Sequence, residues 1–288
     1  MRVLEENRYS NAAIWCERFA VFLVPYFLIV VLLYRFFKIE TMQLFVLVAV
    51  GLILAIVSVV LGLRSIIELW SKGYRGGSHV VRGLLIAVVI LLPFMYQAFL
   101  AVQFPLLNDV ATDPFNPPQY LAANSFRTVR ADEGMNPVRP YSPEHAQTVV
   151  TAYPSLQPRR YPASSERVYD AVQSIIQENE WPITGTSGVL EATPATEAEV
   201  QNTETAEEAL EDNAPPPEDI EVEFVQRTLL FGFANDAVIR IGSEDQNTVV
   251  DMRVSSRWGE HDFGHNARLI EEFFSQLDEA LLGIAGEG

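Results

Sequence analysis

Residues 251–268 contain the side chains of this sequence that are best suited to chemistry. Arginines, histidines and the start of a predicted helix gather there, and forked guanidinium groups and helix N-termini both favour anions such as carboxylates and phosphates. Asp251 and Asp262 lie in the same stretch and would repel an anion. One hypothesis is therefore an anion-binding site, and its candidate residues are Arg253, Arg257, Asp262, His265, Asn266 and Arg268.

A second hypothesis for this stretch is metal binding. His261 and His265 lie four residues apart, with Glu260 and Asp262 on either side of His261, so they could offer imidazole and carboxylate ligands to a zinc-like ion. No further ligand pair, cysteine ligand set, glycine-rich phosphate loop or dinucleotide fingerprint occurs in the sequence. Ser187 lies in a fragment of the nucleophile-elbow pattern, but a turn explains that fragment better. We therefore predict no metal, no cofactor and no catalytic residue.

The hypothesis that we favour for this stretch is structural. Residues 248–255 alternate between apolar and polar side chains, and residues 234–241 precede them as a second strand. If residues 242–247 form the hairpin loop between the two strands, Ile241 pairs with Thr248. One face of the sheet is then apolar, and the other face carries charges.

The charges on that second face are expected to form ion pairs that hold the corner together. Arg257 and Arg268 would brace the turn after the last strand onto the sheet, and Asp262 would cap the helix that follows. The predicted latch consists of Asp236 opposite Arg253, and of Asp251 diagonal to Arg240.

Residues 147–284 predict an α+β domain around this corner. The predicted order is one strand, one helix, four strands and one helix, which gives an antiparallel sheet of about five strands with two helices on one face. This is the helix-grip order of TATA-binding-protein-like folds, a shape shared by unrelated functions. The predicted strands are 148–153, 181–189, 222–231, 234–241 and 248–255, and the first predicted helix covers 164–178. The second predicted helix carries one apolar stripe, formed by Ile270, Phe273, Phe274, Leu277 and Leu281.

Two stretches of this half of the chain are predicted to lack regular structure. Residues 105–146 form a proline-rich strap and connector, which could dock a partner; we favour a strap that lies against its own domain, because Phe115 and Tyr120 need burial. Residues 193–219 hold nine acids, no Lys or Arg and no aromatic residue. Such a composition predicts a disordered acidic insertion between two strands, with an acidic cation- or partner-binding loop as the alternative.

Residues 1–104 predict a transmembrane region of three helices. Its apolar runs cover residues 19–34, 42–63 and 83–104. About 20 residues span the hydrocarbon core of a bilayer, so the second and third runs are long enough, and the first is long enough with the phenylalanines that follow it.

Charge predicts the orientation of these spans. Arg64, Lys72, Arg75 and Arg82 fall in or beside the second connection, which the positive-inside rule therefore places in the cytoplasm together with the N-terminus. The rest of the chain has eleven Arg and 32 acids, a net charge of −21, which with +4 for residues 1–104 gives −17 in total. Such an acidic domain lacks the local positive charge that nucleic acid requires, so we predict no nucleic-acid partner. With three spans and a cytoplasmic N-terminus, the residues after Phe104 lie across the membrane and form an exported domain. The one cysteine, Cys16, lies before the first run, so this domain has no disulfide.

Two strings in the exported half resemble the domain of unknown function 1499 family. One is Asn108-Asp-Val-Ala-Thr-Asp113 with Pro117-Pro118, and a strand that begins Asn235-Asp236 is similar to another part of the family pattern. The closing string is Asp251-Met-Arg253-Val-Ser-Ser-Arg257-Trp-Gly259-Glu-His-Asp262-Phe-Gly264-His-Asn266-Ala-Arg268. Val254 and Asn235 depart from the Ser and Asp of the family. The resemblance implies a bacterial exported or membrane-tethered domain with no assigned activity.

These observations predict a multi-pass protein of the bacterial inner membrane whose C-terminal domain is periplasmic or otherwise extracytoplasmic. Our leading hypothesis is that this domain binds a protein or envelope component without catalysis, while the spans contact the bilayer and possible partners in it. The alternative is an envelope enzyme, or a receptor for a small anion or a metal, that uses Arg253, Arg257, Asp262 and His265.

Overall fold

The computed structural model describes residues 8–37, 39–121, 130, 134–188, 219–244 and 247–283. The chain divides into two compact units. One comprises Met1–Gln103 with Leu229–Gly232, and the other comprises Phe104–Thr228 with Phe233–Gly288. Each unit is described by itself below.

The first unit is a bundle of three helices, α1 (Asn11–Phe37), α2 (Thr41–Lys72) and α3 (Gly77–Gln103). All three are long and apolar enough to cross a membrane, which confirms the three predicted spans. Each helix extends beyond its apolar run, because polar and charged residues at the ends of a span continue the helical hydrogen bonds into the interface.

Small residues allow the three helices to pack closely. A Cβ atom on Gly83 of α3 would lie 2.8 Å from the backbone nitrogen of Glu17 on α1, so a larger residue there would separate the helices. Ser58 of α2 donates a hydrogen bond to the carbonyl of Cys16 at 2.9 Å. The bundle is therefore joined by close backbone approach, buried polar contacts and a few buried apolar residues such as Leu23 and Leu44, while many of its large apolar side chains face outward.

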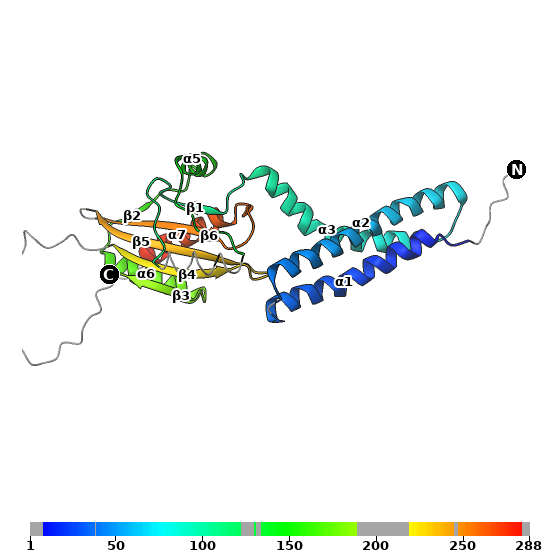
Figure 1. Ribbon diagram of the computed structural model, residues 1–288, viewed down its shortest axis with the longest axis horizontal. Coiled ribbons are helices and arrows are strands. Elements are labelled where there is room, and N and C mark those ends of the chain that lie inside the picture. Colours follow the sequence, from blue (N-terminus) through cyan, green and yellow to red (C-terminus); the bar gives the residue numbers. More distant parts are fainter. Residues whose placement is uncertain are drawn as a thin grey trace, which may run out of the picture. The chain divides into compact units, whose positions relative to one another are not determined.

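The second unit is built on a six-stranded antiparallel sheet (Figure 1). The strands run in the order β1-β6-β5-β4-β3, and β2 also pairs with β6. Their bounds are β1 (Asp109–Ala111), β2 (Arg159–Tyr161), β3 (Ile183–Ser187), β4 (Ile220–Arg227), β5 (Ala234–Glu244) and β6 (Asn247–Ser256). This confirms the prediction of three N-terminal helices followed by an antiparallel sheet with helices.

Two helices, α6 (Ser165–Glu178) and α7 (His265–Gly283), pack on one face of the sheet. Figure 1 shows α6 and α7 lying along the long strands. Ser164 caps α6 by accepting a hydrogen bond from the backbone of Arg167. The predicted stripe on α7 enters the core: Ile270, Phe273, Phe274 and Leu277 are buried against the apolar face of β4, β5 and β6.

The predicted strand at residues 148–153 is wrong, because these residues belong to helix α5 (Pro143–Ala152). Ser142 caps this helix and Pro143 occupies its first turn, and this start signal outweighs the β-branched residues that follow. The chain order is therefore β1-α5-β2-α6-β3-β4-β5-β6-α7, and the helix-grip order is not confirmed. The short strands β1 and β2 had no sequence pattern of their own.

The predicted register of the β5–β6 hairpin is wrong by two residues. Both strands continue to Glu244 and Asn247, and Ile241 pairs with Val250 instead of Thr248. A shift of two leaves each side chain on its predicted face, because side chains alternate with a period of two. It changes the partners, so that Arg240 lies directly opposite Asp251. The acidic stretch 193–219 lies outside the described residues, apart from Asp219.

We expect Phe273→Ala to destabilise the sheet unit by about 3–5 kcal/mol, because Phe273 is fully buried between Phe224 and Phe274 and its loss leaves a cavity. Urea unfolding of the full chain in detergent, followed by tryptophan fluorescence, measures this change. Ser275→Ala, on the exposed side of the same helix, is the control and should change the free energy of unfolding by less than about 0.5 kcal/mol. Equal effects of the two substitutions would contradict the assignment of the core.

Candidate functional site

The face of the sheet opposite α6 and α7 is polar and nevertheless buried. Asp236, Asp251, Arg253 and Ser255 on β5 and β6 each expose less than a tenth of their surface. Tyr120 and Val138, from the segment predicted as a strap, pack on Val238 in the middle of this face in a second, smaller core. The strap therefore lies against its own domain and covers the charged side of the sheet. We call this region the polar sheet face.

Arg253 and Asp109 form the central ion pair of the polar sheet face. The Nε of Arg253 donates to Oδ1 of Asp109 at 3.0 Å, and Nη2 donates to Oδ2 at 2.8 Å, so the pair is bidentate. The guanidinium also donates to the carbonyl oxygens of Pro118 at 3.3 Å and Arg139 at 3.0 Å. Although burial lowers the pKa of Arg253, the hydrogen bond to Asp109 raises it above its ordinary value, so the residue stays charged.

Two tyrosines enclose this guanidinium. The ring centroid of Tyr120 lies 5.2 Å from the Cζ of Arg253, and that of Tyr141 lies 4.8 Å away, which are cation–π distances. The Tyr141 hydroxyl donates to Asp109 at 2.8 Å, and the Tyr120 hydroxyl donates to the carbonyl of Asp236 at 2.9 Å. Burial raises the pKa of both hydroxyls well above the usual value. The tyrosines therefore remain neutral donors that close the pair off from solvent.

Asp236 is bound by two arginines. Arg130 donates to its Oδ2 at 2.5 Å, and Arg257 donates from Nε at 2.9 Å and from Nη2 at 2.7 Å. Arg130 exposes 1% of its side chain and also donates to the Ser255 hydroxyl at 3.2 Å. Arg257 thus braces its turn onto the sheet, through Asp236.

Arg240 and Asp251 form a third pair, at 2.8 Å, directly across the β5–β6 ladder. Arg240 exposes 16% of its side chain, so this pair is less enclosed than Arg253 with Asp109 or Arg130 with Asp236. Thr112, which follows β1, donates to the other oxygen of Asp251 at 3.4 Å. Burial raises the pKa of Asp251, and the hydrogen bond from Arg240 opposes that rise without overcoming it.

Asp262 forms the corner between β6 and α7. Its Oδ1 accepts from the backbone N–H of Gly264 at 2.9 Å, and its Oδ2 accepts from that of Asn266 at 3.1 Å. Gly264 has φ +73°, and a Cβ atom there would lie 3.0 Å from the ring of Phe104, so a glycine suits this turn. Burial raises the pKa of Asp262, and the two N–H groups oppose that rise.

The remaining candidates of the anion site also have partners within the protein. The Asn266 side chain donates to the carbonyl of Asn108 at 3.0 Å and accepts from the Ser256 hydroxyl at 3.2 Å. Arg268 donates to the carbonyl of Phe263 at 3.2 Å. His265 lies 3.3 Å from the amide oxygen of Gln226, and burial lowers the pKa of this histidine. The side chains proposed for an anion thus contact protein groups instead.

The two histidines proposed for a metal face different neighbours. His261 accepts a hydrogen bond from the backbone of Phe263 at 3.0 Å and stacks on its ring, whereas His265 faces Gln226 on β4. Within the described ranges, no group of three His, Cys, Asp or Glu side chains is placed to hold a metal ion.

Sequence reasoning missed several residues of the polar sheet face. Asp109, Arg130, Tyr120 and Tyr141 come from the stretch that was predicted to be strap or connector. No strand pattern could have found Asp109, because β1 is only three residues long; the only signal was the family-like string from Asn108 to Asp113.

The fold and this network define a class of protein: a chain with three helices that can span a membrane and an α+β domain sealed by buried ion pairs. A family model described as "Protein of unknown function (DUF1499)" matches residues 109–277, and the chain belongs to this family. The match begins at Asp109, the partner of Arg253. Comparisons with curated proteins and with solved structures find no match to this chain.

Asp109→Ala should destabilise the protein by about 3–5 kcal/mol, because it leaves the Arg253 guanidinium buried without its carboxylate. Asp109→Ala combined with Arg253→Met should recover most of this loss, since no charge is then left buried. The free energy of unfolding in urea measures both variants.

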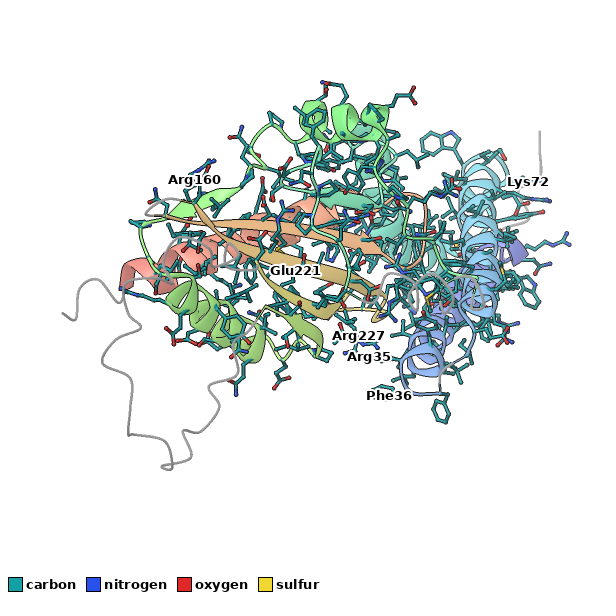
Figure 2. The ribbon with its side chains drawn as sticks, turned by 60° about the vertical axis from the view of Figure 1, so that its left-hand side comes forward. Arg35, Phe36, Lys72, Arg160, Glu221 and Arg227 are labelled. Carbon is teal, nitrogen blue, oxygen red and sulfur yellow. The ribbon has the colours of Figure 1, made fainter. Side chains whose placement is uncertain are left out.

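The control for this cycle is the exposed pair of Arg160 with Glu244 at the end of the sheet, where Figure 2 labels Arg160. Arg160→Ala should cost only about 0–1 kcal/mol, because both side chains are solvated. If Asp109→Ala cost no more than Arg160→Ala, the central pair would not be a stabilising element.

Asp262 should give the protein a measurable pH dependence. Its pKa is raised in the folded state, so the folded protein binds more protons than the unfolded chain between about pH 3.9 and the raised pKa, and its contribution to stability falls as pH rises through that window. The difference in unfolding free energy between the wild type and Asp262→Asn should therefore decrease with rising pH. Urea titrations at several pH values measure it, and a difference that is flat or increases would contradict the burial of this carboxylate.

Proposed function

We propose that this protein is a membrane-tethered binding module of the bacterial cell envelope. In this proposal its three helices lie in the inner membrane with the N-terminus in the cytoplasm. The α+β domain is periplasmic or otherwise extracytoplasmic and binds a protein or envelope component without catalysis. The cationic residues Arg64, Lys72, Arg75 and Arg82 support this orientation through the positive-inside rule.

The charged residues of the polar sheet face bond to other groups of the protein, and this supports binding over catalysis. Catalytic and ligand-binding groups must reach a reacting molecule, whereas Arg253, Asp109 and Asp236 are buried and bonded to one another or to neighbouring protein groups. The network holds the strap and the corner of the sheet in place. The network is a structural scaffold. A partner would therefore bind the outer surface of the domain, whose shape this scaffold fixes.

The observation that carries the proposal is Phe115, an exposed aromatic residue on a fixed loop. Phe115 exposes 69% of its surface, so its predicted burial against the domain is wrong, whereas Tyr120 is buried. The Asp113 carboxylate accepts from the backbone N–H groups of Phe115 at 3.2 Å and Asn116 at 3.1 Å, which is a local turn. Arg240 donates to the carbonyl of Asn116 at 3.0 Å, and Pro117 behind it is buried. The loop is thus fixed by Asp113 and by Arg240 of the polar sheet face, and it leaves the Phe115 ring exposed to solvent.

A preformed aromatic anchor is suited to partner binding because little conformational entropy is lost when it docks. The strongly acidic charge of the chain after Phe104 disfavours anionic surfaces as the partner. We therefore assign to the partner an apolar pocket with a neutral or basic rim.

The test is a photo-crosslinking amino acid at position 115 of the full chain in living cells. We expect one discrete protein adduct there, and none from a crosslinker at Ile183, an exposed apolar position on β3. Asp113→Ala should lower the yield at position 115 several-fold, because the loop loses two hydrogen bonds. Adducts with lipid alone, or the same adducts at both positions, would overturn the proposal.

A further inference from the structure

An open groove of about 700 Å³ lies in the helix bundle, between α1 and the start of α3. Its lining combines two chemistries. Ile14, Val21 and Phe22 give an apolar wall along α1, and Val21 and Phe22 each expose about half of their surface. Tyr9, Glu17, Arg18 and His79 give a polar end.

The acid at the polar end is already neutralised. Glu17 contacts the ring nitrogen of His79 and lies 3.3 Å from a guanidinium nitrogen of Arg82. Arg18, one residue further along α1, lies over the ring of Trp15 at 5.4 Å, and no carboxylate of the described residues is within ion-pair distance of it. Among the described residues, the groove therefore offers a cation that has no carboxylate partner.

The rim of the groove is held in place by the backbone. Tyr9 forms a bridge with Arg75 of the α2–α3 connection, where the N–H of Arg75 donates to the carbonyl of Arg8 at 3.0 Å and the N–H of Ser10 donates to the carbonyl of Arg75 at 3.0 Å. The Tyr9 ring meets His79 edge-on, at 6.3 Å between centroids. Lys72 and Arg8 both lie over Tyr74 at this end of the bundle, so the surroundings are cationic.

We infer that this groove binds an anionic phospholipid. One acyl chain lies along Ile14, Val21 and Phe22, and the phosphate contacts Arg18 with the Tyr9 hydroxyl as a further donor. Charge complementarity selects the headgroup, since cationic residues outnumber acids at this end of the helices and attract an anionic lipid. The long arginine side chain can reach the interface while its apolar stem stays on the helix. This site depends on the helices lying in a membrane and does not depend on the partner of the α+β domain.

The test is native mass spectrometry of the full chain in detergent with added phosphatidylglycerol, and with phosphatidylcholine of the same acyl chains. We expect the wild type to retain one phosphatidylglycerol and little phosphatidylcholine. Arg18→Ala should weaken retention about fivefold, the effect expected for one cationic residue at an anionic surface. Arg64→Ala is the matched control, because Arg64 is an exposed arginine of α2 that does not line the groove, and it should leave retention unchanged.

Two further measurements keep the inference falsifiable. Val21→Trp should fill the apolar wall and reduce retention, and urea unfolding of the α+β domain should be unaffected by any of these variants. Inorganic phosphate should not displace the lipid, because it has no acyl chain. Equal losses from Arg18→Ala and Arg64→Ala, equal retention of the two lipids, or displacement by phosphate would each overturn a defined lipid site.

Discussion

The ion pair between Arg253 and Asp109 is the interaction on which the rest of the α+β domain depends. It joins residues 144 positions apart, and it fixes the start of the strap to the last strand of the sheet. A buried guanidinium needs an opposite charge and acceptors for its N–H groups, and beside Asp109 the strap and connector supply Arg253 with two carbonyl oxygens and two tyrosine rings. Burying one charge pair thus determines the course of the strap across the polar sheet face.

The same constraint explains why the charged corner is a scaffold. Asp236 holds Arg130 and Arg257, and Asp262 holds the first turn of α7, so the strap, the sheet and the helix meet through buried hydrogen bonds. The loop that exposes Phe115 lies on the outer surface of the domain, where Asp113 fixes it by a hydrogen bond from the backbone of Phe115. The charged side chains thus position these segments, and the proposed recognition of a partner rests on the exposed Phe115.

Local patterns predicted a large part of this fold. The three apolar runs, the helix at 164–178 and the apolar stripe of α7 are each a pattern within one continuous segment, so they can be read from the residues of that segment alone. The alternation in β5 and β6 assigned the faces of the sheet, and it did so despite a register error of two, because a shift of two preserves the period. Asp262 was placed as the cap for the same local reason.

Arg240 and Asp251 pair as the hairpin predicted, but the partners of Asp236 and Arg253 could not be predicted, because they come from distant segments. Asp236 was assigned to Arg253 from the hairpin alone, but Arg253 pairs with Asp109 on a three-residue strand. Reaction of the native full chain with an arginine-selective dicarbonyl reagent, followed by peptide mass spectrometry, tests the sealed network most directly. Arg253, 1% exposed, should stay unmodified while Arg160, 61% exposed, reacts. Modification of Arg253 as fast as Arg160 would show a guanidinium open to solvent and would contradict the account.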